Sequence, residues 1–354
     1  ATGMIGCDLG LASCTCCQAG FGKSGARFIV STIFAVNMIG WFGIQNGVCG
    51  EAFSNAMLAM TGWDIPVVVS NTIWGIIMLL TAVYGVHALE KLDKISIPLL
   101  MIIMCYGTFL AFKVYGTGNL NDEGTVQSMS FMSGVALSFN FTAVGTITGP
   151  DYTRFQKSRK DTVKSVFYGV FPMGVITLIM GIVLTKLSGQ YDISMVLIEV
   201  GLPLLGIIAL VISTWTTNST NAYSAGLNIV MALKLKDNRR REATLISGIV
   251  GIVLCDLGIL GHVEGVLSLL SYVVCPVGGV ILADYWVVGK GKAKNFRPQD
   301  GVNWAGVIAW ALGAIISYTL VKIEFVGIII GFVIYLIAER FIPSASRDNA
   351  ENIA

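Results

Sequence analysis

The stretch STWTTNSTN at residues 213–221 decides the fold, because eight of its nine residues are Ser, Thr or Asn although apolar segments flank it on both sides. The preceding residues read VGLPLLGIIALVI and the following ones AYSAGLNIVMAL, which is typical of a helix that crosses a bilayer. Polar side chains at that depth are costly unless they find partners or face a wet cavity. The stretch therefore indicates a membrane protein with a polar site inside it.

The composition of the whole chain places it among integral membrane proteins. Of its 354 residues, 55% are apolar and only 12% are charged, whereas a soluble domain carries roughly 25% charged residues. The mean hydropathy is +0.75. The net charge of +2 gives no reason to expect a nucleic-acid partner, because membrane topology explains where the basic residues lie.

Ten segments are long and apolar enough to cross a lipid bilayer, for which about 20 apolar residues suffice. The predicted spans are residues 27–58, 65–86, 93–116, 129–149, 162–187, 202–233, 242–260, 264–288, 302–321 and 324–342. The apolar segment 192–200 is too short to span and is predicted to lie at the membrane interface. The spans predict an all-α integral membrane protein.

Basic residues mark alternate ends of these spans. Of the 23 Lys and Arg residues, 20 fall at one set of ends and three at the other. The first set consists of Lys23, Arg27, Lys91, Lys94, Arg340, Arg347 and the basic residues within 154–164, 234–241 and 290–297. The positive-inside rule predicts that this side is cytoplasmic, with both termini and the tail 343–354, in a multi-pass protein of the cell membrane. The loop 119–124, on the opposite side, carries two acidic residues and no basic one.

The cysteines and histidines offer no recognisable reaction centre. Cys7, Cys14, Cys16 and Cys17 cluster near the start of the chain, but their spacing does not match paired CxxC zinc ligands. We expect free thiols, because the cytoplasm is reducing. The chain has two histidines and no P-loop, Rossmann glycine pattern, HExxH motif or nucleophile elbow, so we predict that it is not an enzyme.

Helical geometry divides the polar stretch into two faces. The hydroxyl face holds Ser213, Thr216, Thr217 and Thr220, and the amide face holds Thr214, Asn218 and Asn221. Hydroxyl oxygens and free carbonyls suit a hard cation such as Na⁺, and amides suit a neutral ligand that has donors and acceptors. The alternative is that these side chains only join neighbouring helices. Their density favours a binding site.

Two further segments add aromatic and amide side chains. Trp41 and Gln45 lie four residues apart, so a helix presents them on one face, where a ring beside an amide suits a flat heterocycle. The segment 138–155, SFNFTAVGTITGPDYTRF, holds Asn140 and Phe141 among glycines and a proline, which indicates an interrupted helix of the kind that lines transporter sites. Ordinary packing and an ordinary kink are the alternatives.

Four motifs along the chain resemble those of the nucleobase–cation symport family 1, and most of all its bacterial cytosine permeases. They are WFGIQ, GTITGPDYTRF, STWTTNSTNAYSAGL and PVGGVILADYW, in this order. The resemblance implies a leucine-transporter-type fold of two inverted five-helix repeats followed by two peripheral helices. It implies a single transmembrane domain, with 1–25 as the end of helix two and a cytoplasmic loop, 27–288 as the transport core and 302–342 as the peripheral helices. The first two family helices would then be missing from this chain.

The resemblance also implies roles for individual residues. It places Trp41 and Phe141 on the two faces of the ring of a bound base, with the edge of the base read by Gln45, Asn140, Asn218 and Ser213. It places Ser213, Thr216 and Thr217 at half of a sodium site. Ser213 and Met38 replace an Asn and a Gln of the cytosine permeases, whereas Gln45 is shared with hydantoin carriers. The resemblance therefore leaves the identity of the substrate undecided among cytosine, a purine, uracil and a hydantoin-like ring.

Together these features predict a secondary active transporter that imports a nucleobase-like heterocycle with Na⁺ by alternating access. A proton-coupled carrier that uses Glu51 or Asp256 is the first rival, since Asp256 lies near the middle of its predicted span. Asp284 is expected to pair or cap structurally. An intramembrane enzyme or a channel is the rival from another class, but the chain shows neither a catalytic group nor a repeated filter motif. The sequence predicts no oligomeric state.

Overall fold

The computed structural model describes residues 1–121, 130–190 and 192–342, and these residues form helices and no strand. The predicted all-α class is therefore confirmed. The tail 343–354 and residues 122–124 of the predicted acidic loop lie outside the described residues.

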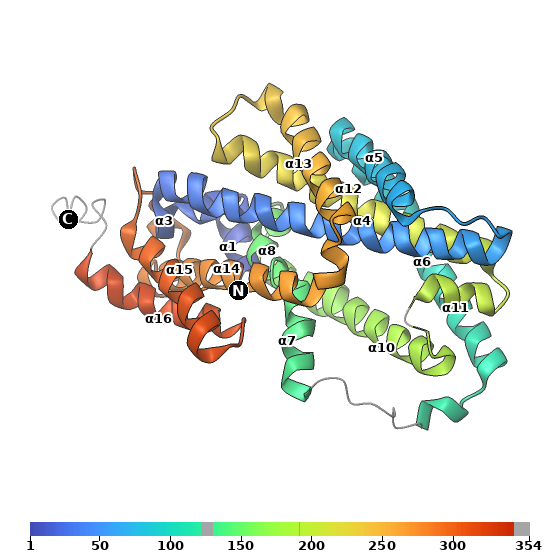
Figure 1. Ribbon diagram of the computed structural model, residues 1–354. Coiled ribbons are helices and arrows are strands. Elements are labelled where there is room, and N and C mark those ends of the chain that lie inside the picture. Colours follow the sequence, from blue (N-terminus) through green and yellow to red (C-terminus); the bar gives the residue numbers. More distant parts are fainter. Residues whose placement is uncertain (122–129, 191, 343–354) are drawn as a thin grey trace.

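The helices follow one another along the chain as Figure 1 labels them. The α-helices are α1 (Thr2–Leu9), α2 (Ser13–Cys16), α3 (Gln18–Gly25), α4 (Ser31–Thr61), α5 (Val67–Tyr84), α6 (Val86–Tyr115), α7 (Phe131–Thr142), α8 (Gly145–Thr153), α9 (Arg159–Ser165), α10 (Phe171–Ser188), α11 (Ile193–Glu199), α12 (Pro203–Ala232), α13 (Arg240–Asp256), α14 (Val263–Leu282), α15 (Trp304–Ile316) and α16 (Val326–Phe341). Turns of π-helix extend four of them: η1 (Ala26–Val30), η3 (Val166–Val170), η6 (Ala283–Val288) and η8 (Ser317–Val321). The short 3₁₀ turns are η2 (Gly118–Asn121), η4 (Asp237–Arg239), η5 (Ile259–His262) and η7 (Ala293–Asn295).

Each predicted span coincides with one of these helices or with a consecutive pair. Within the described residues, six helical segments are long and apolar enough to cross a membrane, and seven if the bent pair α7–α8 counts as one. The 30-residue α12 is long enough, but its polar stretch lowers its hydropathy, and α13 and α16 have only 17 and 16 residues. The count of ten spans stays a prediction. The segment 192–200 forms the seven-residue α11, too short to span, as predicted.

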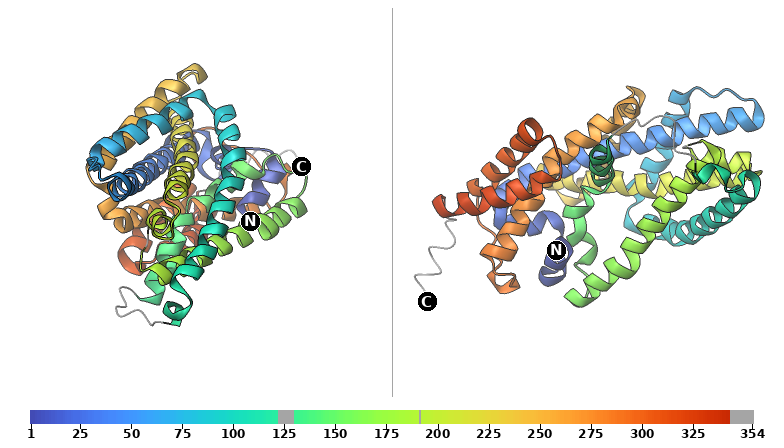
Figure 2. Two further views of the ribbon diagram at one scale, coloured as in Figure 1. Left: turned by 90° about the vertical axis from the view of Figure 1, so that its right-hand side faces the viewer. Right: turned by 90° about the horizontal axis from the view of Figure 1, so that it is seen from below.

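The long helices α4 and α12 lie side by side through the middle of the molecule, and α5 and α13 pack along them (Figure 1). Small residues permit the close approach. A Cβ atom at Gly226 of α12 would lie 2.0 Å from the Thr244 hydroxyl oxygen of α13, so no larger residue fits there. The helices α15 and α16 lie at one end of the molecule and α6 and α11 at the other (Figure 2). The helices α4, α5, α12 and α13 thus form a four-helix bundle, and packing within it fixes the position of α4 and its side chains.

The interrupted helix predicted in 138–155 is present. The helix α7 ends at Thr142, α8 begins at Gly145, and the two are bent by 40°. The helix α8 packs against α1 almost backbone to backbone, because a Cβ atom at Gly6 would lie 2.4 Å from Pro150 Cα. The Thr153 hydroxyl strengthens the contact by donating to the Gly3 carbonyl at 2.6 Å. One half of the broken helix is therefore joined to α1, and the other half, α7, packs against α14.

Candidate functional site

The two aromatic residues predicted to hold a ring lie next to each other. Trp41 of α4 and Phe141 of α7 have ring centroids 5.7 Å apart and ring planes inclined by 54°. A base stacked between parallel rings needs planes about 7 Å apart, twice a carbon–carbon contact distance of about 3.5 Å. In this conformation the rings therefore touch each other, and a base enters between them only if α7 and α4 separate or the rings turn.

The two amides predicted beside these rings have unused hydrogen-bonding capacity. Gln45 lies one helical turn from Trp41, is half-buried and makes no side-chain hydrogen bond with any described residue. Asn140 precedes Phe141 and is only 4% exposed, yet its Oδ1 atom has no partner among the described residues. Buried amide groups are nearly always hydrogen-bonded. These two are therefore available to a ligand.

A third amide of this kind was missed by the sequence reasoning. Asn37 lies four residues before Trp41 and so on the same face of α4. It is 1% exposed, its Nδ2 reaches the Leu270 carbonyl of α14 at 3.5 Å, and its Oδ1 has no partner within the described part of the chain. The same spacing that singled out Gln45 identifies Asn37 as well. The face of α4 toward α7 and α14 therefore carries Asn37, Trp41 and Gln45 in three successive turns.

Asn218 lies in a different setting. It is fully buried, and its Nδ2 donates to the Phe42 carbonyl at 3.1 Å and contacts the Met78 sulfur at 3.5 Å. Its Oδ1 accepts from Asn221 Nδ2 at 3.4 Å. All polar atoms of this side chain therefore have protein partners, and they join α12 to α4 and α5. Its role in reading a base stays a prediction, because it would have to exchange one of these bonds for the ligand.

The hydroxyl face of α12 points away from this packing. Ser213 and Thr217 are exposed and Thr216 is half-buried, whereas on the amide face Thr214 and Asn218 are buried and Asn221 is half-buried. The Thr216 and Thr217 hydroxyls each donate to the Ser213 carbonyl at 3.1 Å, and the Ser213 hydroxyl donates to the Leu210 carbonyl at 3.0 Å. Because each proton is held against the helix, the lone pairs of the three oxygens point outward. Three oxygen atoms with outward lone pairs suit a bound cation.

The acidic residues considered for proton coupling differ in their surroundings. Asp256 is the last residue of α13, so its predicted place near the middle of a span was wrong. The helix ends there because the chain turns at Gly258, whose φ is +87°. The Asp256 carboxylate accepts from Asn71 Nδ2 at 3.3 Å. Asp284 is buried and accepts from the Tyr335 hydroxyl at 2.7 Å, in keeping with a structural role, and Glu51 is exposed on α4.

The thiols near the start of the chain are not arranged as a metal site. Among the described residues, no group of three or more His, Cys, Asp or Glu side chains is placed to hold a metal ion. Burial raises the pKa of Cys14 and of Cys16 to about 12, so both stay protonated, whereas zinc binds the thiolate. The Cys14 thiol instead donates to Asn228 Oδ1 at 3.3 Å.

Comparison with known proteins identifies the family. A model of the family described as permeases for cytosine/purines, uracil, thiamine and allantoin matches residues 1–339. The chain belongs to this family. It is 31% identical over 335 residues to the cytosine permease of Escherichia coli (strain K12), which covers 93% of this chain and 76% of that permease. It is 25% identical over 398 residues to the allantoin permease of Bacillus subtilis (strain 168), with 97% of this chain and 80% of that protein covered.

Solved structures show the fold. The nucleobase-cation-symport-1 family transporter Mhp1, in a closed conformation with bromovinylhydantoin bound, superposes with a TM-score of 0.75 at 20% identity, over 96% of this chain and 81% of that one. Its inward-facing conformation superposes with a TM-score of 0.77, over 96% and 79%. The predicted membership of nucleobase–cation symport family 1 and the predicted leucine-transporter-type fold are confirmed. The permease is a multi-pass membrane transporter, which sets the enzyme and channel alternatives aside.

Proposed function

We propose that this permease imports a planar nucleobase-like heterocycle together with Na⁺ across the cell membrane by alternating access. The observation that carries the proposal is the contact of Trp41 and Phe141, brought together from α4 and α7 at ring centroids 5.7 Å apart. Aromatic faces recognise a flat ring without reading its edge. Gln45 and Asn140, whose amides are unused, flank this pair and supply the edge recognition.

The unpaired groups support a class of substrate. Asn37 and Asn140 both present a buried oxygen that lacks a partner among the described residues, so the ligand must offer N–H donors. Gln45 can donate and accept, which suits a ring carbonyl beside a ring N–H. Cytosine, uracil, an oxopurine such as hypoxanthine and a hydantoin all carry such an edge. The relatives' names, cytosine permease and allantoin permease, point to heterocycles of this kind.

The ion is assigned to the hydroxyl face of α12. Ser213, Thr216 and Thr217 offer three outward oxygens, and Na⁺ prefers oxygen ligands. Ser213 lies within the same stretch as the amide face, so ion binding and base binding share one helix. This arrangement supports coupling through the position of α12. The rival is proton coupling through Asp256, whose carboxylate is hydrogen-bonded to Asn71.

Topology and domain limits complete the proposal. The side with most basic residues is assigned to the cytoplasm, together with the C-terminal tail. Residues 27–288 form the transport core and 302–342 two peripheral helices. In support, α15 and α16 pack mainly on each other and on α14, and not on the α4–α12 pair.

The test is uptake of labelled cytosine, uracil, hypoxanthine and a hydantoin into vesicles, with Na⁺ replaced by choline at fixed pH. We expect saturable uptake of at least one base, recovered unmodified, that is lost in choline. Uptake that persists in choline and follows an imposed pH gradient would replace Na⁺ by H⁺ in the proposal. Absence of uptake and binding for every base would overturn the substrate class.

A further inference from the structure

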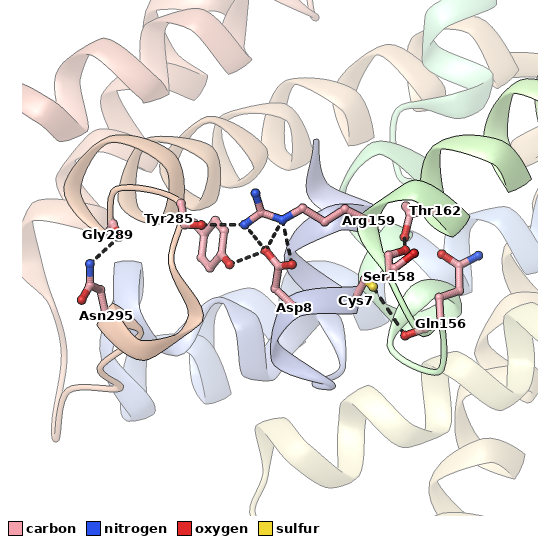
Figure 3. Close-up of polar contacts among 10 residues, drawn as sticks. Cys7, Asp8, Gln156, Ser158, Arg159, Thr162, Tyr285, Gly289 and Asn295 are labelled. Carbon is pink, nitrogen blue, oxygen red and sulfur yellow. Dashed lines mark hydrogen bonds and ion pairs between the residues drawn. The ribbon is translucent and has the colours of Figure 1, made fainter.

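A polar cluster joins three elements that lie in or beside the basic segments 154–164 and 290–297 (Figure 3). Asp8 lies near the C-terminal end of α1, Arg159 is the first residue of α9, and Tyr285 lies in η6, which continues α14. Asp8 is 151 residues from Arg159 and 277 from Tyr285 along the chain, yet both hydrogen-bond its carboxylate. We name Asp8, Arg159 and Tyr285 the triad.

Arg159 binds the carboxylate with two of its nitrogen atoms. Its Nε lies 2.8 Å from Asp8 Oδ1 and 2.9 Å from Oδ2, and its Nη2 also donates to Oδ2. The Tyr285 hydroxyl donates to the same Oδ2. The Asp8 side chain is only 13% exposed. Two-pronged, charge-assisted bonds of this kind are the strongest that side chains make, and partial burial protects them from solvent screening.

The loop after η6 folds back over the same guanidinium. Arg159 Nη2 donates to the Gly291 carbonyl at 2.6 Å, and its Cζ lies 4.9 Å from the Trp286 ring. Gly291 has a φ of +62°, and a Cβ there would come within 2.9 Å of the ring. Only glycine therefore lets the loop reach Arg159. The guanidinium is held from one side by α1 and from the other by η6 and its loop.

The elements that the triad joins differ in the helices against which they mainly pack. The helix α1 is joined to α8 by the Thr153–Gly3 hydrogen bond and the close backbone contact described above. The helix α8 is one half of the broken helix whose other half carries Asn140 and Phe141. The helix α14 packs mainly on α15 and α16 and less extensively on α1, α7 and α8, and it shares a hydrophobic cluster with Ile5 of α1 and Ile147 of α8. The triad is therefore a bridge between the unit that carries part of the candidate site and the unit that contains α14.

We propose that the triad is a gate of the transport cycle. Asp8, Arg159 and Tyr285 are positioning residues that hold η6 against α1 and α9 while the site is closed toward the side with most basic residues, and they separate when the site opens to that side. In this proposal, the site opens between α14 and the α1–α8 unit, and that opening breaks these contacts. The proposal rests on the transport activity of the family and on neither the substrate nor the ion proposed above. Closed and inward-facing forms of Mhp1 show that this fold adopts more than one state.

A second ion pair supplies a matched control. Lys23 Nζ lies 2.7 Å from Asp300 Oδ1, but the two side chains are 52% and 92% exposed. Exposed pairs contribute little to stability. Asp300→Asn therefore removes the same kind of charge as Asp8→Asn without breaking a bridge between the two units.

The experiment is hydrogen–deuterium exchange, read by mass spectrometry, on the purified protein without added base or Na⁺. In Asp8→Asn we expect amides in 276–288 and in 145–153 to exchange about tenfold faster, which is the effect expected for the loss of one charge-assisted hydrogen bond. Tyr285→Phe, which keeps the ion pair, should give the same pattern at smaller amplitude. Amides in α5 and α13 should not change, and Asp300→Asn should match the wild type.

Two outcomes would overturn the gate. One is a change confined to the residues next to the mutated side chain, which would make the triad a local tie. The other is an unchanged exchange pattern in both variants.

If Asp8→Asn unfolds the protein, exchange also rises in α5 and α13, and Tyr285→Phe then decides between a gate and a local tie. A reversed pair, Asp8→Arg with Arg159→Asp, should restore part of the wild-type protection if the bridge itself matters. Because no base or Na⁺ enters, failure here leaves the proposed substrate and ion untouched.

Discussion

Buried polar groups lack hydrogen-bonding partners beside the Trp41–Phe141 contact but have them in the triad. Beside the aromatic pair, the oxygens of Asn37 and Asn140 are buried and have no partner among the described residues. In the triad, the Asp8 carboxylate accepts bonds from both other members. An unpaired buried amide costs free energy that a ligand can recover, whereas a fully paired charge has nothing left to offer. The first region is therefore suited to binding a ligand, and the second to holding elements of the protein together.

The largest effect is expected at the aromatic pair. Trp41→Ala should weaken binding of the transported base by roughly 1–3 kcal/mol, the range for stacking of a base on an aromatic ring. Trp41→Phe should lose only part of this, because a smaller aromatic face remains. Inhibition constants from a competition series of cytosine, uracil, hypoxanthine, adenine and a hydantoin provide the measurement. Unchanged constants in Trp41→Ala would show that the tryptophan only packs against Phe141.

A pair of asparagines tests whether unpaired groups serve the ligand. Asn218→Ala should lower the free energy of unfolding by about 1–3 kcal/mol, because the Phe42 carbonyl loses its donor and Asn221 its acceptor. Asn140→Leu should leave thermal stability unchanged or raise it, since it removes an unpaired buried oxygen, and should abolish discrimination among bases. Thermal unfolding and the same competition series measure both. A stability loss at Asn140 equal to that at Asn218 would contradict the comparison.

The hydroxyl face should show a smaller effect. Thr216→Ala and Thr217→Ala should each raise the Na⁺ concentration for half-maximal uptake severalfold, as loss of one ligand worth about 1 kcal/mol implies. Thr220, on the same face but without an assigned ion role, is the matched control, and its hydroxyl donates to the Thr216 carbonyl. Sodium dependence that stays the same in both variants would remove these threonines from the ion site.

The smallest effect concerns the thiols near the start of the chain. Burial raises the pKa of Cys14 and Cys16 to about 12. At pH 7.5 fewer than about one such thiol in a thousand is then ionised. We therefore expect neither cysteine to react with a maleimide in the folded protein. Raising the pH should increase their reactivity, since more thiolate forms. The half-buried Cys7 should react first. Equal labelling of Cys7 and Cys16 under native conditions would contradict the burial that sets these pKa values.

Much of the fold could be predicted because its signals are local. Apolar runs separated by basic clusters predicted where the helices lie, and the glycines of 138–155 predicted the break between α7 and α8. The division of 213–221 into a hydroxyl and an amide face follows from helical periodicity alone, and in the structure Ser213 is exposed whereas Asn218 is buried. Asp256 was misplaced because hydropathy continues past the residue where Gly258 turns the chain. Boundaries of that kind depend on backbone conformation, which apolarity does not report.

Sequence by itself determined that this chain crosses a membrane, that it carries amides and hydroxyls at depth, and which aromatic residues accompany them. Only the tertiary structure decided which of those groups have hydrogen-bonding partners within the protein. Asn218 and Asn140 are the same residue type and both lie in helices, but packing gives one its partners and leaves the oxygen of the other without a partner among the described residues. It also decided that Asp8, Arg159 and Tyr285 meet. Hydrogen bonds depend on distances between atoms far apart in the chain, and only the packing of the helices sets those distances.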